Sequence, residues 1–282
     1  MKKINLKRRQ AGFTLVELSV VLVVVGLLFG AVVKGQEMVD VAKAQKLVQD
    51  LKNTEAIVQK YALAKGRMPG DCDSDGVVDF AADATLRTDI DNTARAAKYN
   101  YTTTQPTYGT STTIAAADFG CLQMGSLSSG GSATLTNTDI TAPLQANTWI
   151  NDLKLAGMVS DSVPNRIFAK TVNEDFMFLG SVQDQSDMSA TATYNAIVVH
   201  NVPQWMARSV ATAINGSDAV ANRGRVRQLV RTGSDGSYNA TWDLTSGVAG
   251  EKMRDSMVSI VYFYDRVPAA TGGIYVAPVG PT

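Results

Sequence analysis

The sequence predicts an α+β protein, with one long N-terminal α-helix followed by a globular head of mixed strands and helices. Residues 13–33 form a long apolar run, and an apolar stripe at helical spacing continues from it to about residue 62. Beyond residue 67, short runs rich in branched and aromatic residues alternate with turn-forming segments. The 282 residues leave room for one sizeable domain in addition to the helix.

The apolar run FTLVELSVVLVVVGLLFGAVV, residues 13–33, is long enough to cross a membrane as a helix. Its 21 residues span about 31 Å at ~1.5 Å per residue. Five bases and no acid precede the run, and the next base is Lys34, which predicts a cytoplasmic N-terminus. An ordinary secretory signal peptide has a shorter apolar core and a cleavage site after it. Here the small residue typical of a cleavage site, Gly12, comes before the run.

The formal net charge of zero conceals the basic character of this N-terminus. Removal of residues 1–12 takes away five of the 26 bases, which leaves 21 bases against 26 acids and a net charge of −5. A mildly acidic body has no general attraction for nucleic acid, so the composition gives no reason to expect a nucleic-acid partner.

The segment KRRQAGFTLVELSVVLVVVGLL closely resembles the N-terminal signature of type IV prepilins, in which a basic leader, Gly, Phe, Thr-Leu-x-Glu and an apolar helix occupy fixed offsets. The resemblance implies that a membrane prepilin peptidase cuts between Gly12 and Phe13 and N-methylates Phe13. A glycine before the cut fits this chemistry, because a peptide without a Cβ can approach a protease closely. The resemblance also implies a pilin-like fold, in which the long helix packs on an antiparallel sheet.

Glu17 lies inside the apolar run, where a carboxylate is costly unless it finds a partner. The resemblance implies a salt bridge between Glu17 and the α-amine of Phe13 on a neighbouring subunit. That pairing would set the axial register of the helices in a filament core. The alternative is a carboxylate near the end of the span that reaches headgroup water.

An amphipathic second half is predicted for the same helix over residues 34–66. Its apolar stripe consists of Val41, Ala44, Val48, Leu51, Val58 and Ala62. Gly66 and Pro69 are expected to end the helix. The predicted divisions of the chain are therefore a leader (1–12), a transmembrane or filament-core helix (13–33), the amphipathic half (34–66) and the head (67–282).

Alternate acids follow the helix in MPGDCDSDGVVDF, residues 68–80. The residues that match positions one, three, five, six and nine of an EF-hand-like calcium loop are Asp71, Asp73, Asp75, Gly76 and Asp79. The Val77 carbonyl stands at position seven. Position twelve is Ala82, where a bidentate Glu belongs, so Asp83 or a distant acid would have to replace it. Ca²⁺ is therefore a candidate cofactor, and the alternative is an Asp/Gly-rich turn.

The two cysteines, Cys72 and Cys121, have neither a short metal-binding spacing nor a CxxC redox motif. In an oxidising compartment we expect one disulfide that closes a long loop. Such a bond contributes roughly 2–4 kcal/mol, mainly by restricting the unfolded chain. The alternative is a pair of buried free thiols.

The head is predicted to contain several strands and helices. Strands are expected at 176–182, 194–201, 226–230 and 259–267, and helices at 148–157 and 203–214. Residues 99–148 are rich in Thr, Ser, Ala and Gly, which predicts a surface insertion or short edge strands with loops. Segments 148–164 and 202–227 also resemble parts of a group of prepilin-type proteins, which supports a single pilin-like head.

Four arginines, Arg223, Arg225, Arg227 and Arg231, form the basic cluster of the head. Alternate arginines on a strand are typical of a solvated face. The alternative is a surface that binds DNA or an acidic partner.

The sequence offers no constellation that would support an enzyme. His200 is the sole histidine, and GxSxG, P-loop and HExxH motifs are absent from the sequence. The predicted function is a structural subunit, a major or minor pilin, of a type IV pilus-like filament. The alternatives are a pseudopilin of a type II secretion system and a filament-tip subunit for adhesion or DNA uptake.

The predicted partners and locations follow from this function. The partners are prepilin peptidase, an inner-membrane platform protein of the assembly machine, other copies or related pilins, and the lipid bilayer before assembly. The predicted location is the inner membrane, as a single-pass protein with a periplasmic head, and after assembly a filament that is at the cell surface or spans the periplasm.

Overall fold

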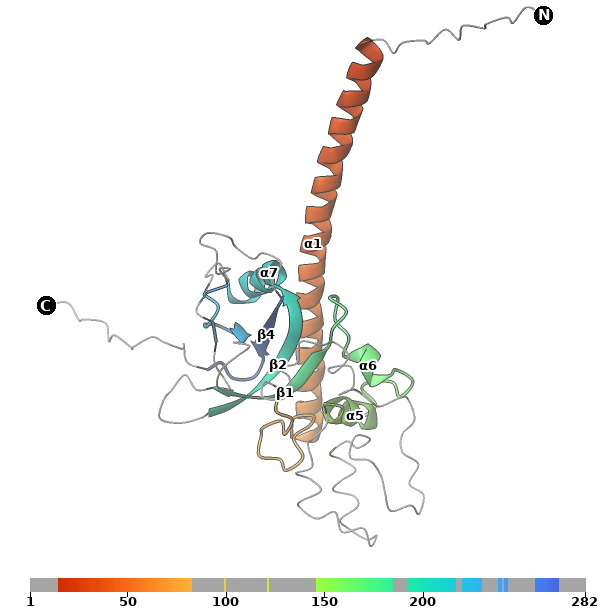
Figure 1. Ribbon diagram of the computed structural model, residues 1–282. Helices are drawn as coiled ribbons and strands as arrows, with labels where there is room; N and C mark the ends of the chain where they lie inside the picture. Colours follow the sequence, from red (N-terminus) through yellow and green to blue (C-terminus); the bar gives the residue numbers. More distant parts are fainter. Residues whose placement is uncertain are drawn as a thin grey trace, which may run out of the picture. The chain divides into compact units, whose positions relative to one another are not determined.

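The computed structural model describes residues 15–82, 99, 121, 146–184, 192–216, 220–229, 238–239, 241–242 and 257–268. In chain order the helices and strands are α1 (Leu15–Lys65), α5 (Thr148–Leu155), α6 (Asn165–Phe168), β1 (Met177–Asp184), β2 (Ala192–Pro203), α7 (Gln204–Asn215), β3 (Val226–Leu229) and β4 (Met257–Phe263) (Figure 1). The chain divides into two compact units, Met1–Ala42 and Lys43–Thr282. The element order confirms the α+β class, with a long helix before a sheet-containing part.

Within the first unit, α1 is apolar on every side. Leu22, Val23 and Leu28 point to three different sides of the helix and are 64%, 63% and 60% exposed. By length and composition this part of α1 could cross a membrane. A helix that is hydrophobic all round belongs in a membrane or in the interior of a larger assembly.

Within the second unit, α1 buries one face against the head. The buried residues of α1 are Ala44, Leu47, Leu51, Thr54, Glu55, Val58 and Tyr61. Three of the six residues predicted for the stripe belong to this face, whereas Val41 is exposed and Val48 and Ala62 are half-buried. The helix ends where predicted: the Gly66 N–H donates to the Ala62 carbonyl, and Gly66 has a φ of +75° that favours glycine.

The described strands form one sheet in the order β1-β2-β4-β3, and all neighbouring strands are antiparallel. All four predicted strands are confirmed, and so are the helices that became α5 and α7. Met177 of β1 lies opposite Val199 of β2, and the pairing of β2 with β4 shifts register between Val199 and Val202. β2 is buried without a break over residues 195–200, which explains its continuous apolar run.

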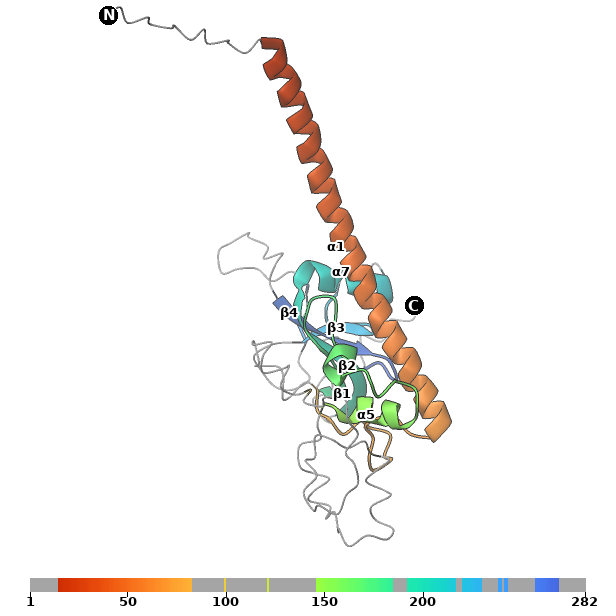
Figure 2. The same cartoon turned by 90° about the vertical axis from the view of Figure 1, so that its right-hand side faces the viewer.

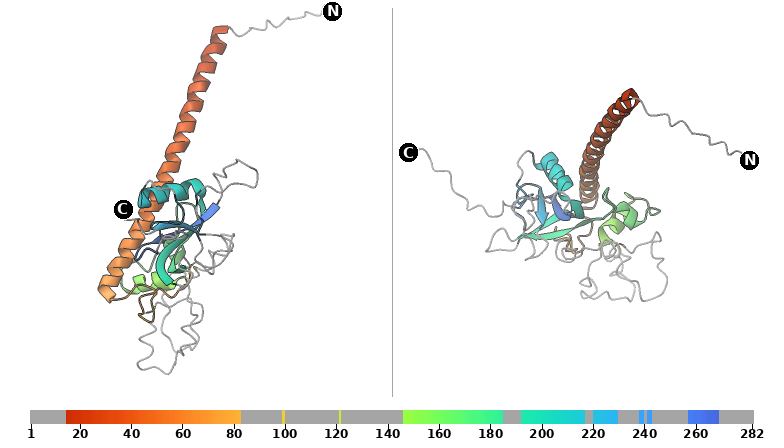
Figure 3. Two further views of the ribbon diagram at one scale, coloured as in Figure 1. Left: turned by 90° about the vertical axis from the view of Figure 1, so that its left-hand side faces the viewer. Right: turned by 45° about the horizontal axis from the view of Figure 1, so that its top comes forward.

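The helices of the head lie close to the sheet and to the end of α1. α7 continues directly from β2 (Figure 2). Its residues Met206, Ala207 and Val210 belong to the common core. α5 lies beside the C-terminal end of α1 (Figure 3). There Trp149 of α5 packs against Gly70: a Cβ added to Gly70 would lie 3.4 Å from the Trp149 Cβ.

Both edges of the sheet carry further segments of the same chain. At the β1 edge, the Ser181 N–H donates to the Phe80 carbonyl (2.7 Å) and the Ala82 N–H donates to the Ser181 carbonyl (2.9 Å). At the β3 edge, the Gln228 N–H donates to the Ala221 carbonyl (2.8 Å), and residue 239 donates its N–H to the Gln228 carbonyl (3.0 Å).

A cluster of charged and phenolic groups joins α1 to the sheet, and we call Lys52, Glu55, Arg225 and Tyr262 the Glu55 cluster. The Glu55 carboxylate accepts hydrogen bonds from Arg225 (2.8 Å), the Tyr262 hydroxyl (2.6 Å) and Lys52 (3.0 Å). Burial of Glu55 opposes its ionisation. The hydrogen bonds from Tyr262, Lys52 and Arg225 outweigh this effect and hold the pKa of Glu55 below its ordinary value.

The arginines of the head do not form the solvated basic face that the sequence predicts. Arg225 is half-buried in the Glu55 cluster. Arg227 of β3 is fully buried, with its guanidinium over the rings of Tyr238 (5.0 Å) and Phe263 (5.3 Å). The prediction is wrong for both residues because aromatic rings and internal acceptors within the head take up their charges. Arg223 is exposed, and Arg231 lies outside the described residues.

Candidate functional sites in the N-terminal segment and the loop after α1

The predicted processing site precedes α1 in the sequence, and the acidic residue predicted to pair with it belongs to α1. Gly12 and Phe13 are outside the described residues. Glu17 lies in the first turn of α1, where the positive end of the helix dipole favours a carboxylate. Its neighbours in the chain, Val16 and Leu18, are both exposed apolar residues.

The loop Asp71–Asp79 follows the end of α1 and has an ordered backbone. The Asp79 N–H donates to the Gly70 carbonyl (3.1 Å), which closes the base of the loop. Gly76 has a φ of +88°, a left-handed conformation that glycine adopts without strain. The sharp turn that an EF-hand-like loop requires at its sixth position is therefore present.

Within this loop, each of three aspartates accepts a backbone N–H with one carboxylate oxygen. Asp71 accepts from Gly76 (3.1 Å), Asp73 accepts from Asp75 (3.2 Å), and Asp75 accepts from Val77 (2.7 Å). One oxygen from each of Asp71, Asp73 and Asp75 lies within 4.8 Å of the other two. The structure thus brings together the three acids predicted for positions one, three and five.

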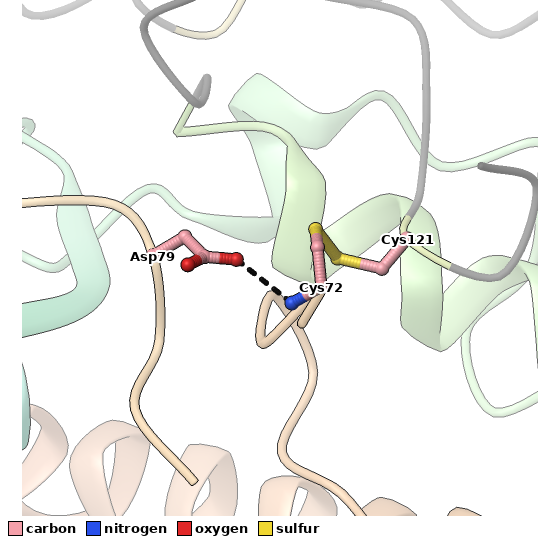
Figure 4. A group of neighbouring side chains, drawn as sticks. All are labelled: Cys72, Asp79 and Cys121. Carbon is pink, nitrogen blue, oxygen red and sulfur yellow. Dashed lines mark hydrogen bonds between the residues drawn. A yellow bond between two sulfur atoms is a disulfide. The ribbon is translucent and has the colours of Figure 1, made fainter. Parts of the chain in front are cut away.

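Asp79, predicted for position nine, is directed differently. Its Oδ2 accepts the Cys72 N–H (2.8 Å), as Figure 4 shows. Burial of the Asp79 carboxyl raises its pKa to about 6, and the nearby charges of Asp73 and Asp71 act in the same direction. Burial is also the main cause that raises the pKa of Asp71. Acidic groups concentrated in this way disfavour one another's ionised forms unless a cation is present.

Cys72 and Cys121 are joined as a disulfide with a Cα–Cα distance of 4.8 Å (Figure 4). Their sulfur atoms lie close to the Asp79 carboxylate. Because the two sulfur atoms are bonded to each other, neither is a thiolate, and Cys72, Cys121 and Asp79 do not form a thiolate metal site. The tie joins the loop to a residue 49 positions later in the chain.

Two side chains distant in sequence hold the loop in place, and sequence reasoning missed both of them. Asn195 of β2 accepts the Val78 N–H (2.8 Å) and donates to the Gly76 carbonyl (2.8 Å). Asp152 of α5 accepts the Gly70 N–H (2.9 Å) and forms a salt bridge with Arg67 (3.2 Å). Asn and Asp are common turn residues, so their presence in α5 and β2 gave no local signal of this role.

Ala82, at position twelve of the calcium pattern, packs into the hydrophobic core. Its N–H is bonded to Ser181, so the chain has left the loop and joined the edge of β1 by this point. Position twelve therefore offers no side-chain ligand. Asp83, the predicted substitute, lies outside the described residues.

His200 lies inside the sheet and not at a surface. Its Nδ1 is 2.8 Å from the Ser259 Oγ on the adjacent strand β4, and both residues are buried. Its ring meets Phe178 edge-on, with 5.8 Å between the ring centroids. These surroundings are those of a core histidine.

Comparison with known proteins identifies the N-terminal segment. Residues 7–33 match the family model described as the prokaryotic N-terminal methylation motif, the signal of type IV pilins and pseudopilins. No curated protein and no solved structure matches the chain. The motif supports a pilin-like or pseudopilin subunit, a structural protein that prepilin peptidase processes and that assembles into pilin polymers. The long apolar helix fits the membrane anchor of such a subunit.

Proposed function

We propose that this chain is a structural subunit, a major or minor pilin, of a type IV pilus-like filament. Prepilin peptidase cuts it between Gly12 and Phe13 and methylates the new N-terminus, and the subunit polymerises through the first part of α1. The observation that carries this proposal is the contrast along α1. Residues 15–33 are apolar on all sides and exposed, whereas residues 44–61 bury one face in the head.

The exposed apolar side chains of residues 15–33 must be covered both before and after the subunit joins a filament. The bilayer covers residues 15–33 before assembly, and the helices of other subunits cover them in the filament. Both environments are apolar, so the transfer of apolar side chains between them has a small net free energy. Glu17 supplies a difference, because its carboxylate is costly in lipid and gains a cationic partner, the α-amine of Phe13 on an adjoining subunit, in the filament.

The remaining partners and the topology belong to the same proposal. The bases before residue 13 keep the N-terminus in the cytoplasm, so the head emerges in the periplasm. An inner-membrane platform protein of the assembly machine then extracts the subunit and adds it to the filament. The mature chain is acidic, and Arg225 and Arg227 make contacts inside the protein. These two arginines therefore do not contribute to a basic surface for nucleic acid on the described part of the head.

Substitution of Glu17 tests the proposal directly. In a strain with an active prepilin peptidase, Glu17→Leu should remain in the membrane fraction and fall at least tenfold in sheared filaments, a loss equivalent to about 1.4 kcal/mol. Ser19→Ala is the matched control, because Ser19 is a polar residue in the same apolar span and its hydroxyl donates to the Val16 carbonyl of its own helix (2.8 Å). Filament incorporation of Glu17→Leu at the level of the control would refute the assembly role.

Mass spectrometry of the N-terminus tests the processing step separately. The protein purified from cells should begin at Phe13 and carry one methyl group. A chain that still begins at Met1 in the presence of the peptidase would refute the whole proposal.

The alternative is a pseudopilin of a type II secretion system, since the matched motif is common to both classes. The two functions differ in where the polymer acts. Loss of surface filaments on deletion of the gene supports the pilin. Retained surface filaments with loss of protein secretion support the pseudopilin.

A further inference from the structure

The loop Asp71–Asp79 contains a feature that a simple turn does not explain. Asp71 is fully buried, and its Oδ1 has no hydrogen-bond partner in the described part of the chain. A buried carboxylate oxygen without a partner is destabilising, because the protein offers nothing in place of its lost hydration. Asp73 and Asp75, whose carboxylate oxygens converge with that of Asp71, are exposed and open the cluster to solvent.

The structure assigns a Ca²⁺ site to this loop. The carboxylates of Asp71, Asp73 and Asp75 and the Val77 carbonyl are its direct ligands, and Asp79 joins through a water molecule. This use of positions one, three, five, seven and nine follows the EF-hand loop, in which position nine often binds through water. The site goes beyond the proposed function, because it concerns the head alone and requires no filament.

The ligands can serve the ion without losing their present hydrogen bonds. Asp71, Asp73 and Asp75 each use one oxygen for a backbone N–H and retain a second oxygen. Asn195 bonds to the Gly76 carbonyl and the Val78 N–H, so it fixes the backbone on both sides of the Val77 carbonyl. This support lowers the entropy lost when the loop binds a cation.

Ligand number and type favour Ca²⁺ over Mg²⁺ and set a modest affinity. Ca²⁺ accepts six to eight oxygens in a flexible arrangement, whereas Mg²⁺ demands a near-ideal octahedron and gives up its waters reluctantly. Ala82 removes the bidentate ligand of position twelve, so water must complete the shell. We therefore expect a Kd of roughly 0.1–1 mM, the range of extracellular calcium modules.

The experiment uses the full-length protein in detergent, freed of metal with a chelator. Addition of about 5 mM Ca²⁺ should raise the thermal midpoint by about 3–5 °C, as linkage predicts for this affinity and this size of head. Mg²⁺ at the same concentration should give less than half of that shift. Titration with Tb³⁺ provides a second signal, because Trp149 packs beside Gly70, next to the first ligand, and can sensitise its luminescence.

The variant Asp73→Asn/Asp75→Asn should weaken Ca²⁺ binding at least tenfold. Both positions are exposed, and Asn retains the oxygen that accepts the backbone N–H, so the fold should survive. Asp161→Asn/Asp265→Asn removes the same charge from exposed positions elsewhere in the head and should bind like the wild type.

Three results would each overturn the site. The first is a midpoint that does not change with Ca²⁺ when the wild-type protein also fails to sensitise Tb³⁺. The second is an equal shift with Mg²⁺, which indicates nonspecific charge screening. The third is an equal loss of Ca²⁺ affinity in the two double variants. The proposed filament function would survive any of them, because its tests read N-terminal processing and assembly.

Discussion

The Glu55 cluster should stabilise the packing of α1 on the head, and Glu55→Gln measures its contribution. The carboxylate accepts hydrogen bonds from the cationic groups of Arg225 and Lys52, from the Tyr262 hydroxyl and, at 3.4 Å, from the Gln59 amide. Hydrogen bonds to charged groups contribute about 1.5–3 kcal/mol each, against about 0.5–1.5 kcal/mol for neutral ones. A glutamine loses the charge and turns an amide donor towards groups that are themselves donors. Arg225 and Lys52 remain 34% and 41% exposed, which screens part of the effect. We therefore expect a loss of about 2 kcal/mol.

Thermal unfolding of the full-length protein in detergent, followed by circular dichroism, measures this loss. A change of about 2 kcal/mol corresponds to a fall of about 4–8 °C in the midpoint for a head of this size. Lys46→Ala is the control, because it breaks the exposed Lys46–Asp50 pair on the same helix and should cost less than about 0.5 kcal/mol. A double-mutant cycle with Arg225→Gln isolates the direct coupling. A midpoint change for Glu55→Gln no larger than that of the control would refute the role of the cluster.

Three further predictions follow from the structure. The pKa of Glu55 is lower in the folded state than its ordinary value of 4.5, so the stabilisation by the ionised carboxylate is complete above pH 4.5. This stabilisation is lost as the pH falls through the folded-state pKa, and the thermal midpoints of wild type and Glu55→Gln should therefore converge in acid. Reduction of the Cys72–Cys121 disulfide should lower stability by about 2–4 kcal/mol, measured by melts with and without reductant. Gly180→Ala should cost about 2–3 kcal/mol in the same assay, because its Cβ would overlap the Phe80 carbonyl oxygen.

Each of these changes has a control in the same chain. Gly35→Ala places a Cβ in open space on α1 and should not destabilise the protein, in contrast to Gly180→Ala. Reductant should leave the melt of Cys72→Ser/Cys121→Ser unchanged. Melts that stay equally far apart at acidic and neutral pH would contradict the ionised state assigned to Glu55.

Local sequence patterns predicted most of the described helices and strands. β1, β2, β3 and β4 were predicted within a few residues because branched and aromatic residues fill them between turn-forming segments. α6 was missed, since four residues carry no helical periodicity. The buried face of α1 was predicted only in part, because Glu55 is buried by virtue of partners that lie about 170 and 207 residues later in the chain.

The same limit applies to the loop after α1. Its own residues predicted the acids that converge and the glycine that turns, since both depend on local spacing. The supports from Asn195 and Asp152 depend on tertiary packing and have no local signature. Arg227 shows the opposite error: a basic residue in an alternating pattern was expected in solvent, but aromatic side chains of the head cover it.

Because both edges of the described sheet are paired with other segments of the chain, the sheet is protected against aggregation through its edges. A strand with a bare edge invites another chain to extend the sheet, which leads to disordered aggregates. Here Phe80–Ala82 occupies the rim of β1, and residues 221 and 239 occupy that of β3. Two heads in contact would thus find no unpaired outer strand of the described sheet to extend, so this sheet offers no ready template for strand-by-strand aggregation.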